Sequence, residues 1–227
     1  MEHPPLFSRS VVVDGYIGVG KSTLLRNLCD ITKPWLHPYQ ICVYEENVIS
    51  WENYYGHNLL EQMYENMDDP ESPWTCRLQT KIIKDIMAQD VKIRLNLPRQ
   101  LSIQERDLNT VKKVFLPGHK KSLNELDYHI LHELVDFGID LNSGTNDKLK
   151  VFLSADKMTC YNRMMSRKRN AERNISIHDY MTLCEAMDLI KADASIVLNT
   201  DQLNSTQVSI RMNQLLLSAL RPAPIVK

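Results

Sequence analysis

Glycine is rare in this chain except at one place. Only 7 of the 227 residues are glycine, and Gly15, Gly18 and Gly20 fall within six residues of one another. A chain that concentrates glycine in this way needs unusual backbone freedom, or a close approach of the backbone to another group, at that point. The β-branched run at residues 10–14 predicts a buried strand that ends at Gly15, and residues 21–32 carry leucines at helical spacing. The cluster is therefore predicted to join a strand to a helix.

The peptide from Gly15 to Ser22 matches the phosphate-binding pattern GxxxxGK(S/T), in the strand-to-helix context that this pattern requires. Inward-pointing amides and a helix N-terminus suit phosphate oxygens, Lys21 supplies a positive charge, and the Ser22 hydroxyl suits Mg²⁺. We therefore expect a nucleoside triphosphate here, as in kinases, GTPases and ATPases alike. The residues expected to hold it are Gly15, Tyr16, Ile17, Gly18, Val19, Gly20, Lys21, Ser22 and Thr23.

Short apolar runs alternate with helical patterns along the rest of the chain. This alternation is typical of parallel βαβ units, in which helices cover both faces of a sheet. Further strands are predicted at residues 41–44, 98–104, 149–153 and 194–198. Further helices are predicted at residues 51–66, 74–92, 121–137, 156–169, 176–191 and 205–220. The predicted class is α/β, a three-layer α/β/α fold of the P-loop NTPase type with a five-stranded parallel sheet.

No repeat or linker divides the chain, so we expect one domain over residues 1–227, with flexible tails at 1–9 and 221–227. The formal net charge of -1 provides no general attraction for nucleic acid or a membrane. No apolar run approaches the length of a transmembrane helix, and the N-terminus shows no signal sequence. The five cysteines are scattered and odd in number, which argues against a disulfide framework and favours a reducing, cytoplasmic compartment.

Two predicted strands end in acidic residues. Glu45 and Glu46 follow the second strand, and Glu105, Arg106 and Asp107 follow the third. Ligands of open α/β sheets bind beyond the carboxyl ends of the strands. Phosphorylation of a hydroxyl needs a carboxylate that orients or deprotonates it, a metal ion that bridges the phosphates, and cations near the developing charge. Glu46 and Glu105 fit the first two needs and Arg106 the third, although any one acid alone would be interpreted as a solvated loop charge.

Cations are concentrated further along the chain, where Arg163, Arg167, Lys168, Arg169 and Arg173 fall within eleven residues. Arg163 and Arg167 are four residues apart and so share one face of the predicted helix. Guanidinium groups fit phosphate oxygens, and such a helix could close over a triphosphate as an arginine-rich lid. A solvated helix face or a nucleic-acid patch explains these residues equally well when they are considered alone.

Taken in order, these segments resemble the motifs of the deoxynucleoside kinase family from about residue 10 to about residue 200. The loop resembles that family's GNIGSGKTT, and Glu46 precedes Trp51 at the spacing of its Glu-Pro-x-x-x-Trp segment. Residues 58–64 resemble its N-L-L-x-x-(M/F)-Y run, and Gln79 follows Trp74 at the spacing of its base-reading glutamine. The other matches are Glu105-Arg106-Asp107 for its Glu-Arg-Ser motif, and Arg163, Arg167, Arg169 and Glu172 for its arginine lid.

The resemblance implies an enzyme that uses ATP and Mg²⁺ to phosphorylate the 5′-hydroxyl of a small-molecule deoxynucleoside in nucleotide salvage, usually as a homodimer. On the donor side it implies that Lys21 binds the phosphates and that Ser22 and Glu105 hold Mg²⁺. Residues expected to surround the rest of ATP are Arg163, Arg167 and Arg169, which would clamp the phosphates, and Asp201 and Gln202, which would border the adenine.

On the acceptor side, the resemblance implies that Glu46 takes or orients the 5′-hydroxyl proton and that Arg106 steadies the charge beside it. Tyr64 and Glu172 would hydrogen-bond the deoxyribose 3′-hydroxyl, and Gln79 would pair with the base. The full set of residues expected at the acceptor is Glu46, Trp51, Tyr64, Gln79, Ile82, Ile86, Arg106, Val111 and Glu172.

The chain departs from the family pattern in its acidic segments. Asn47 replaces a proline, and Glu45 adds a second acid, so Glu45 stays a rival to Glu46 as the base. Asp107 replaces a serine, and this extra carboxylate could either join Mg²⁺ coordination or slow turnover.

Base preference depends on Ile86 and Val111, which stand where relatives that favour deoxycytidine and purine deoxynucleosides carry an arginine and an aspartate. The apolar pair favours thymidine and deoxycytidine. Two other functions remain open. A non-catalytic subunit of a larger complex would suit the altered acidic segments, but it would not need both an intact loop and an arginine lid. A nucleoside monophosphate kinase would need cations for the acceptor's own phosphate.

Overall fold

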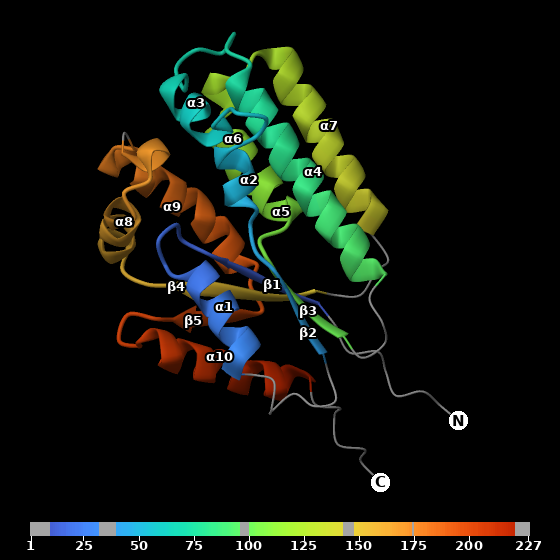
Figure 1. The fold of residues 1–227 in the computed structure, drawn as a ribbon, viewed down its shortest axis with the longest axis vertical. Helices are drawn as coiled ribbons and strands as arrows, with labels where there is room; N and C mark the ends of the chain where they lie inside the picture. The colour runs from blue at the N-terminus through green and yellow to red at the C-terminus, as the bar shows by residue number, and fades with distance from the viewer. Residues whose placement is uncertain (1–9, 32–39, 96–99, 143–147, 174, 221–227) are drawn as a thin grey trace.

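The computed structural model describes residues 10–31, 40–95, 100–142, 148–173 and 175–220 (Figure 1). Within these residues, five strands form one parallel sheet in the order β2-β3-β1-β4-β5. The strands are β1 (Ser10–Gly15), β2 (Gln40–Tyr44), β3 (Gln100–Glu105), β4 (Leu149–Ser154) and β5 (Ile196–Asn199). The predicted α/β class and the five-stranded parallel sheet are confirmed.

β1 occupies the centre of the sheet, between β3 and β4. Val11 and Val13 are completely buried, as expected for a strand whose two faces are both covered. The chain leaves β1 toward one edge of the sheet and leaves β3 toward the other, so the winding direction reverses between these two neighbours. Ligands of open α/β sheets bind beyond the carboxyl ends of strands at such a reversal. Gly15 and Glu105 end the two strands at this point.

Helices cover both faces of the sheet (Figure 1). α1 and α10 pack against each other on one side, and Leu24, Leu25 and Leu28 of α1 are buried there, whereas α4, α7 and α9 lie on the other side. These helices are α1 (Lys21–Ile31), α4 (Trp74–Arg94), α7 (Glu125–Asn142), α9 (Ile177–Ala192) and α10 (Ser205–Leu220). Among the helices that the structure describes, none combines the length and hydropathy that a membrane span requires.

The single helix predicted over residues 51–66 is wrong, because the structure has two short helices in this region, α2 (Val48–Glu52) and α3 (Leu59–Glu65). Between them, Tyr55 and Gly56 adopt the left-handed backbone conformation, with φ values of 50° and 83°, through which a right-handed helix cannot continue. Asn58 caps the start of α3, because its side chain accepts a hydrogen bond from the Glu61 N–H at 3.1 Å.

Residues 108–122 contain short helical elements that the sequence did not predict. They are α5 (Leu108–Thr110), the π-helical turn η1 (Val111–Phe115), α6 (Leu116–Gly118) and the 3₁₀ turn η2 (Lys120–Ser122). The helix predicted over 121–137 is displaced toward the C-terminus and is α7 in the structure. Its start is set by Asn124, whose side chain accepts a hydrogen bond from the Asp127 N–H at 2.8 Å.

The helix predicted over 156–169 is shorter in the structure, where α8 spans Lys157–Ser166. Lys168 has a φ of 54°, which ends the helical path, and the 3₁₀ turn η3 (Asn170–Glu172) follows. Arg167 and Arg169 therefore lie in a turn after the helix. β5 begins and ends later than the predicted 194–198. The other predicted elements lie within a few residues of their observed positions, except that residues 32, 98 and 99 and both predicted tails lie outside the described residues.

Candidate functional site

The phosphate loop joins β1 to α1 and packs against α8. Gly15, Gly18 and Gly20 have φ values of 150°, 87° and 108°, which residues other than glycine rarely adopt. A Cβ atom on Gly18 would lie 2.1 Å from the backbone oxygen of Cys160 in α8. The loop therefore needs glycine both for its conformation and for its close approach to α8.

Lys21 is buried beneath this loop. Its Nζ donates hydrogen bonds to the backbone oxygens of Gly15 at 3.0 Å and Tyr16 at 3.2 Å, and it lies 3.9 Å from Glu105 Oε1. Burial, together with the charge of Arg106, lowers the pKa of Lys21 below that of an ordinary lysine. A phosphate bound in the loop would oppose this shift, because a nearby anion stabilises the charged form of lysine.

Ser22 and Glu105 meet beside Lys21. The Ser22 hydroxyl donates a hydrogen bond to Glu105 Oε2 at 3.1 Å. Burial and the charge of Glu46 raise the pKa of the Glu105 carboxyl. The described residues contain no cluster of three or more histidine, cysteine or acidic side chains that could hold a metal. Mg²⁺, however, takes oxygen ligands and is usually held by one or two carboxylates together with substrate phosphates, so a hydroxyl and a carboxylate at this place fit it.

Arg106 follows β3 directly and has a φ of 61°, which is unusual for arginine. Its buried guanidinium donates from Nη1 to Glu46 Oε1, and its Nε lies 4.0 Å from Asp14 Oδ1. Burial by itself would lower the pKa of Arg106, but the carboxylates of Glu46, Glu105 and Asp14 outweigh it and raise the pKa. This strained turn holds a permanent cation beside a carboxylate, an arrangement typical of functional sites.

Glu45 and Glu46 point into different surroundings. Glu45 accepts hydrogen bonds of 3.0–3.2 Å from the exposed Arg26 guanidinium, outside the cavity described next. Glu46 lies inside that cavity and pairs with Arg106. Of the two rival acids, Glu46 is the one beside the phosphate loop.

A cavity of about 300 Å³ extends from the phosphate loop between the helices above the sheet. It brings together most of the side chains that the sequence singled out. Those that line it are Ile17, Gly18, Lys21, Ser22, Glu46, Trp51, Tyr64, Gln79, Ile82, Ile86, Glu105, Arg106, Val111, Arg167, Arg169 and Glu172. They come from the ends of β1, β2 and β3, from the start of α1, from α2, α3, α4 and η1, and from the turn and η3 that follow α8.

Tyr64 and Glu172 lie together on one side of the cavity, where α3 packs against η3. Burial, and then the charge of Glu172, raise the pKa of the Tyr64 hydroxyl to about 12. Glu172 Oε1 accepts a hydrogen bond from Arg169 at 3.2 Å, whereas its buried Oε2 has no partner among the described residues. A hydroxyl donor and a free carboxylate oxygen can together bind another hydroxyl group.

Trp51 and Gln79 contribute to the more apolar part of the cavity. The Trp51 indole N–H donates a hydrogen bond to Asp85 Oδ2 at 3.1 Å, and Lys81 pairs with the same carboxylate. These contacts fix the orientation of the indole ring. Gln79 is only 1% exposed, and its Oε1 has no hydrogen-bond partner within the described residues. A buried amide oxygen without a partner is rare in native structures and marks a place where a ligand can supply a donor.

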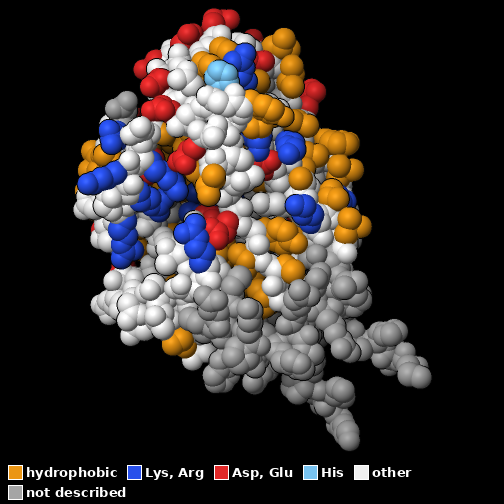
Figure 2. Space-filling model, viewed as in Figure 1, with side chains coloured by type: hydrophobic (Ala, Val, Ile, Leu, Met, Phe, Trp, Pro, Cys, Tyr) orange, Lys and Arg blue, Asp and Glu red, His pale blue; other side chains and the backbone are white. Residues whose placement is uncertain are grey.

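Arginines line a second hollow on the outer side of the loop, of about 330 Å³. Arg163 and Arg167 face Gly18, Val19, Gly20 and Thr23 there, and Figure 2 shows basic side chains gathered over α8. The other residues that close it are Leu24, Thr200, Leu203, Asn204, Ser205 and Val208. Asp201 and Gln202, the predicted neighbours of adenine, are exposed and do not line it, and Asp201 accepts a hydrogen bond from the Asp156 N–H at 2.6 Å.

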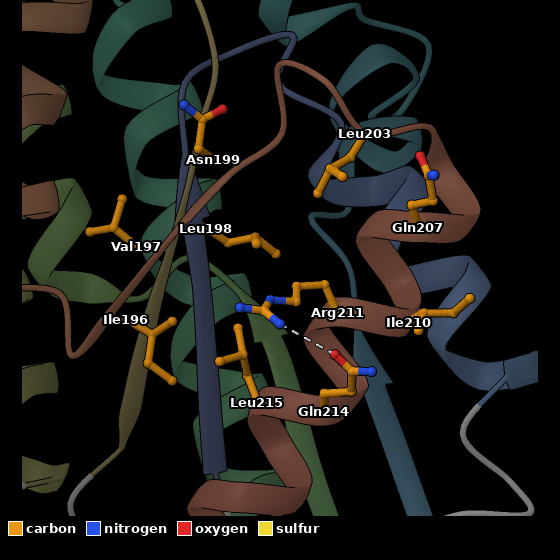
Figure 3. A pocket seen from close by; sticks show the side chains of 10 residues that line it. All are labelled: Ile196, Val197, Leu198, Asn199, Leu203, Gln207, Ile210, Arg211, Gln214 and Leu215. Atoms are coloured by element: carbon orange, nitrogen blue, oxygen red, sulfur yellow. Dashed lines mark hydrogen bonds between the residues drawn. The ribbon is translucent and has the colours of Figure 1, made fainter.

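Another hollow, of about 590 Å³, lies between β5 and α10 and has a different chemistry (Figure 3). Apolar side chains such as Ile196, Leu198 and Leu215 dominate it. The lining also includes the charged side chain of Arg211, whose Nη1 donates a hydrogen bond to Gln214 Oε1 at 3.5 Å. None of the side chains that the sequence singled out lines this hollow, so it is not the candidate site.

Comparison with known proteins agrees with this geometry. The family model described as deoxynucleoside kinase matches residues 11–208. The chain belongs to the deoxynucleoside kinase family. It is also 28% identical to human mitochondrial thymidine kinase 2 over 169 residues, and 29% identical to the same enzyme of Macaca fascicularis. Each of these matches covers 74% of this chain and 58% of the relative, so the chain spans less than two thirds of their length.

Several residues that line the cavity of this deoxynucleoside kinase family member were not predicted from the sequence. The residues concerned are Val48, Leu60, Met63, Met67, Leu78, Val114, Phe115, Gly118, His119, Ile175, Asp179, Thr182, Leu183 and Ala186. Most are apolar residues whose spacing is indistinguishable from that of core positions, so no local signal separates them. Asp14, which lies beside Arg106 but does not line the cavity, was also not predicted, although it directly precedes the first loop glycine.

Asp107, the departure from the family's serine, has a local structural role. Its Oδ1 accepts hydrogen bonds from the backbone N–H groups of Asn109 at 2.9 Å and Thr110 at 3.2 Å, which caps α5. Its Oδ2 accepts a bond from the Asn109 side chain at 3.1 Å, and Asp107 does not line the cavity. Its buried charge instead acts on Asp14, whose pKa is raised by burial and by Asp107.

Proposed function

We propose that this protein transfers the γ-phosphoryl group of ATP to the 5′-hydroxyl of a deoxynucleoside, with thymidine and deoxycytidine favoured, and so acts in nucleotide salvage. The observation that carries the proposal is the partly buried Glu46–Arg106 pair, which lines the cavity where it meets the phosphate loop. A donor nucleotide in the loop and a nucleoside in the cavity would meet at this pair.

At the junction, Glu46 would accept or orient the proton of the attacking hydroxyl while the new oxygen–phosphorus bond forms and the bond to the ADP oxygen breaks. Arg106 and Lys21 would stabilise the negative charge on the transferred group. Ser22 and Glu105 would hold Mg²⁺, which would supply positive charge to offset that of the phosphates. Because these cations are already positioned, little reorganisation would be needed during transfer.

In the cavity, Tyr64 and Glu172 would bind the deoxyribose 3′-hydroxyl, and Gln79 would pair with the base edge. Ile82, Ile86 and Val111 give the base an apolar surround that accommodates a methyl group and offers no charged partner to a purine. This lining supports the preference for pyrimidines, and the name of the human relative, thymidine kinase 2, agrees with it.

On the donor side, Arg163, Arg167 and Arg169 would clamp the phosphates as a lid. The hollow that Arg163 and Arg167 share with the loop glycines supports this role. Thr200 and Asn204 line the same hollow, where they would border the adenine. Asp201 and Gln202 do not line it, so their contact with the adenine stays a prediction.

The experiment is a kinase assay with Mg²⁺-ATP across the four natural deoxynucleosides, with thymidine monophosphate as a further acceptor. Thymidine or deoxycytidine should be phosphorylated fastest. Faster turnover of thymidine monophosphate would favour a nucleoside monophosphate kinase instead. Absence of turnover by folded protein, together with absence of ATP binding in calorimetry, would favour the non-catalytic alternative.

We also propose that two copies of the chain associate, as the family resemblance implies. Apolar side chains at one-face spacing stand exposed on α7, on the right of Figure 2. They are Leu126, Ile130, Phe137 and Leu141, which are 69%, 50%, 56% and 44% exposed. Sedimentation velocity should give a dimer for the wild type and a monomer for the Ile130→Glu, Phe137→Glu variant.

The single-domain organisation and the reducing, cytoplasmic compartment remain predictions. Cys42, Cys76, Cys160 and Cys184 are free thiols in the structure, which suits a reducing compartment. The human relative is named mitochondrial, and this name describes that protein only. Imaging of the full chain in its own cell would decide between the compartments.

A further inference from the structure

His119 is a cavity residue that the proposed function does not use. It follows α6, and it lines the cavity with Val111, Phe115 and Gly118. Its backbone is held on both sides, because its N–H donates to the oxygens of Phe115 at 3.0 Å and Leu116 at 3.2 Å, and its own oxygen accepts from Ser122 at 2.9 Å. These bonds fix the backbone position from which the imidazole reaches the cavity wall.

The imidazole leaves one buried polar atom unpaired. Nδ1 of His119 is shielded from solvent and has no hydrogen-bond partner among the described residues. Its neighbours on the same wall, Val111, Val114 and Phe115, are apolar. A buried polar group without a partner costs free energy and is rare in native proteins, so the atom calls for an explanation.

The ring is neutral under ordinary conditions. Burial alone lowers the pKa of His119 to about 4. A neutral imidazole carries one donor and one acceptor nitrogen, so it suits the carbonyl, amino and ring-nitrogen groups of a nucleobase. It does not suit a phosphate or a carboxylate, which would bind a charged imidazolium.

His119 takes part in none of the hydrogen bonds or ion pairs described above for Glu46, Arg106 and Lys21. Arg106 stacks over the Phe115 ring, with its Cζ 4.9 Å from the ring centre, and this marks the phosphoryl end of the wall. His119 follows Phe115 by about one helical turn. The unpaired oxygens of Gln79 and Glu172 have expected partners in the base and the sugar, whereas Nδ1 of His119 has none.

We propose that His119 is a specificity-determining residue of the acceptor cavity, which hydrogen-bonds through Nδ1 to a polar atom of the nucleobase that Gln79 leaves free. The inference rests on the proposed function and extends it, because it assigns a second polar contact to the base. It implies that the apolar surround provided by Ile82, Ile86 and Val111 selects size, while Gln79 and His119 together select the pattern of donors and acceptors.

The test compares His119→Phe, which keeps a ring but removes the hydrogen bond, with His119→Asn, whose amide can reach the position of Nδ1. With the preferred deoxynucleoside, His119→Phe should lose about tenfold in kcat/KM, mainly through KM, with the KM for ATP unchanged. His119→Asn should recover most of that loss. The ratio of kcat/KM for thymidine to that for deoxycytidine should change in His119→Phe.

A matched control is His129→Phe on α7, where the imidazole is exposed and outside the cavity. It should behave as the wild type. His119→Leu is a second apolar variant in case His119→Phe does not fold, and unfolding midpoints report folding for each variant.

The inference is overturned if the apolar variant keeps kcat/KM within about twofold of the wild type, or if His119→Asn is as impaired as His119→Phe, since the ring would then act by packing alone. Failure of the proposed function is a separate result, because the wild type itself would phosphorylate no deoxynucleoside, and the inference would fall with it.

Discussion

The phosphate loop and the acceptor cavity are built in different ways. The loop is one continuous segment, residues 15–23, whose shape depends on glycine φ values and on backbone groups next to each other in sequence. The cavity takes its walls from α2, α3, α4, residues 111–119, the turn after α8 and α9. Chemistry that resides in local backbone geometry can be read from a short pattern, whereas chemistry assembled from distant side chains becomes visible only in the fold.

On the phosphate-loop side of this comparison, removal of the positive charge of Lys21 should give the largest effect. Lys21→Met keeps a side chain of similar length but removes the charge, so turnover should fall by about 10³-fold and ATP affinity should weaken. Thymidine binding, measured by calorimetry without ATP, should stay unchanged. Lys113→Met, at an exposed pair with Asp193, is the control. If Lys21→Met weakened thymidine binding as much as ATP binding, the phosphate loop and the acceptor cavity would not act separately.

The opposite test removes the proposed base contact. Gln79→Leu should lower kcat/KM for the deoxynucleoside by about 10- to 100-fold, because the base edge would face an apolar side chain. The KM for ATP should not change. Gln62→Leu, outside the cavity on α3, should leave both constants near their wild-type values. If Gln79→Leu raised the KM for ATP as much as that for thymidine, the division between donor and acceptor would be lost.

The accuracy of the sequence-based prediction follows the same division. The sheet, the loop and the order of helices were predictable because β-branched runs, glycines and leucine spacing are local signals. The break at Tyr55 and Gly56 was missed, because the aromatic and leucine positions on both sides continue a helical spacing. The π-helical turn at residues 111–115 was missed because its longer hydrogen-bond spacing has no simple sequence pattern.

The candidate site residues depended on the family resemblance more than on local patterns. Nothing near Gln79 or Tyr64 distinguishes a ligand contact from core packing, and both side chains acquire a possible role only because α3 and α4 bring them to one cavity. The choice between Glu45 and Glu46 likewise needed the fold, which pairs Glu45 with the exposed Arg26. Side-chain direction at the end of a strand depends on the packing around it.

The loop glycines allow a test of how the loop depends on its neighbours. In Gly18→Ala the new Cβ would meet the backbone of Cys160 at 2.1 Å, so the free energy of unfolding should fall by about 2–3 kcal/mol. In Gly20→Ala the new Cβ meets nothing within 4 Å, and the strain of φ 108° alone should cost about 1 kcal/mol. Urea unfolding measures both. Equal losses would show that the contact with α8 contributes nothing.

The use of ATP should depend on pH through two groups on the donor side, Glu105 and Lys21. Glu105 has a raised pKa, so it becomes protonated at a higher pH than an ordinary glutamate as the pH falls, and Mg²⁺ binding weakens. Lys21 has a lowered pKa, so it loses its charge at a lower pH than an ordinary lysine as the pH rises. The kcat/KM for ATP should therefore fall several-fold as the pH falls through the raised pKa of Glu105, and again as the pH rises through the pKa of Lys21, which is about 8. Added Mg²⁺ should restore the acid side only, and a flat profile would contradict these assignments.

Glu46 is the group that we propose to meet the acceptor hydroxyl, and a matched pair of variants tests this assignment most directly. Turnover of thymidine with Mg²⁺-ATP should fall by about 10²- to 10⁴-fold in Glu46→Gln, while ATP binding stays at the wild-type level. Glu45→Gln, one residue away and paired with Arg26 outside the cavity, should turn over at close to the wild-type rate. Normal turnover in Glu46→Gln, with the loss in Glu45→Gln instead, would contradict the assignment of the base.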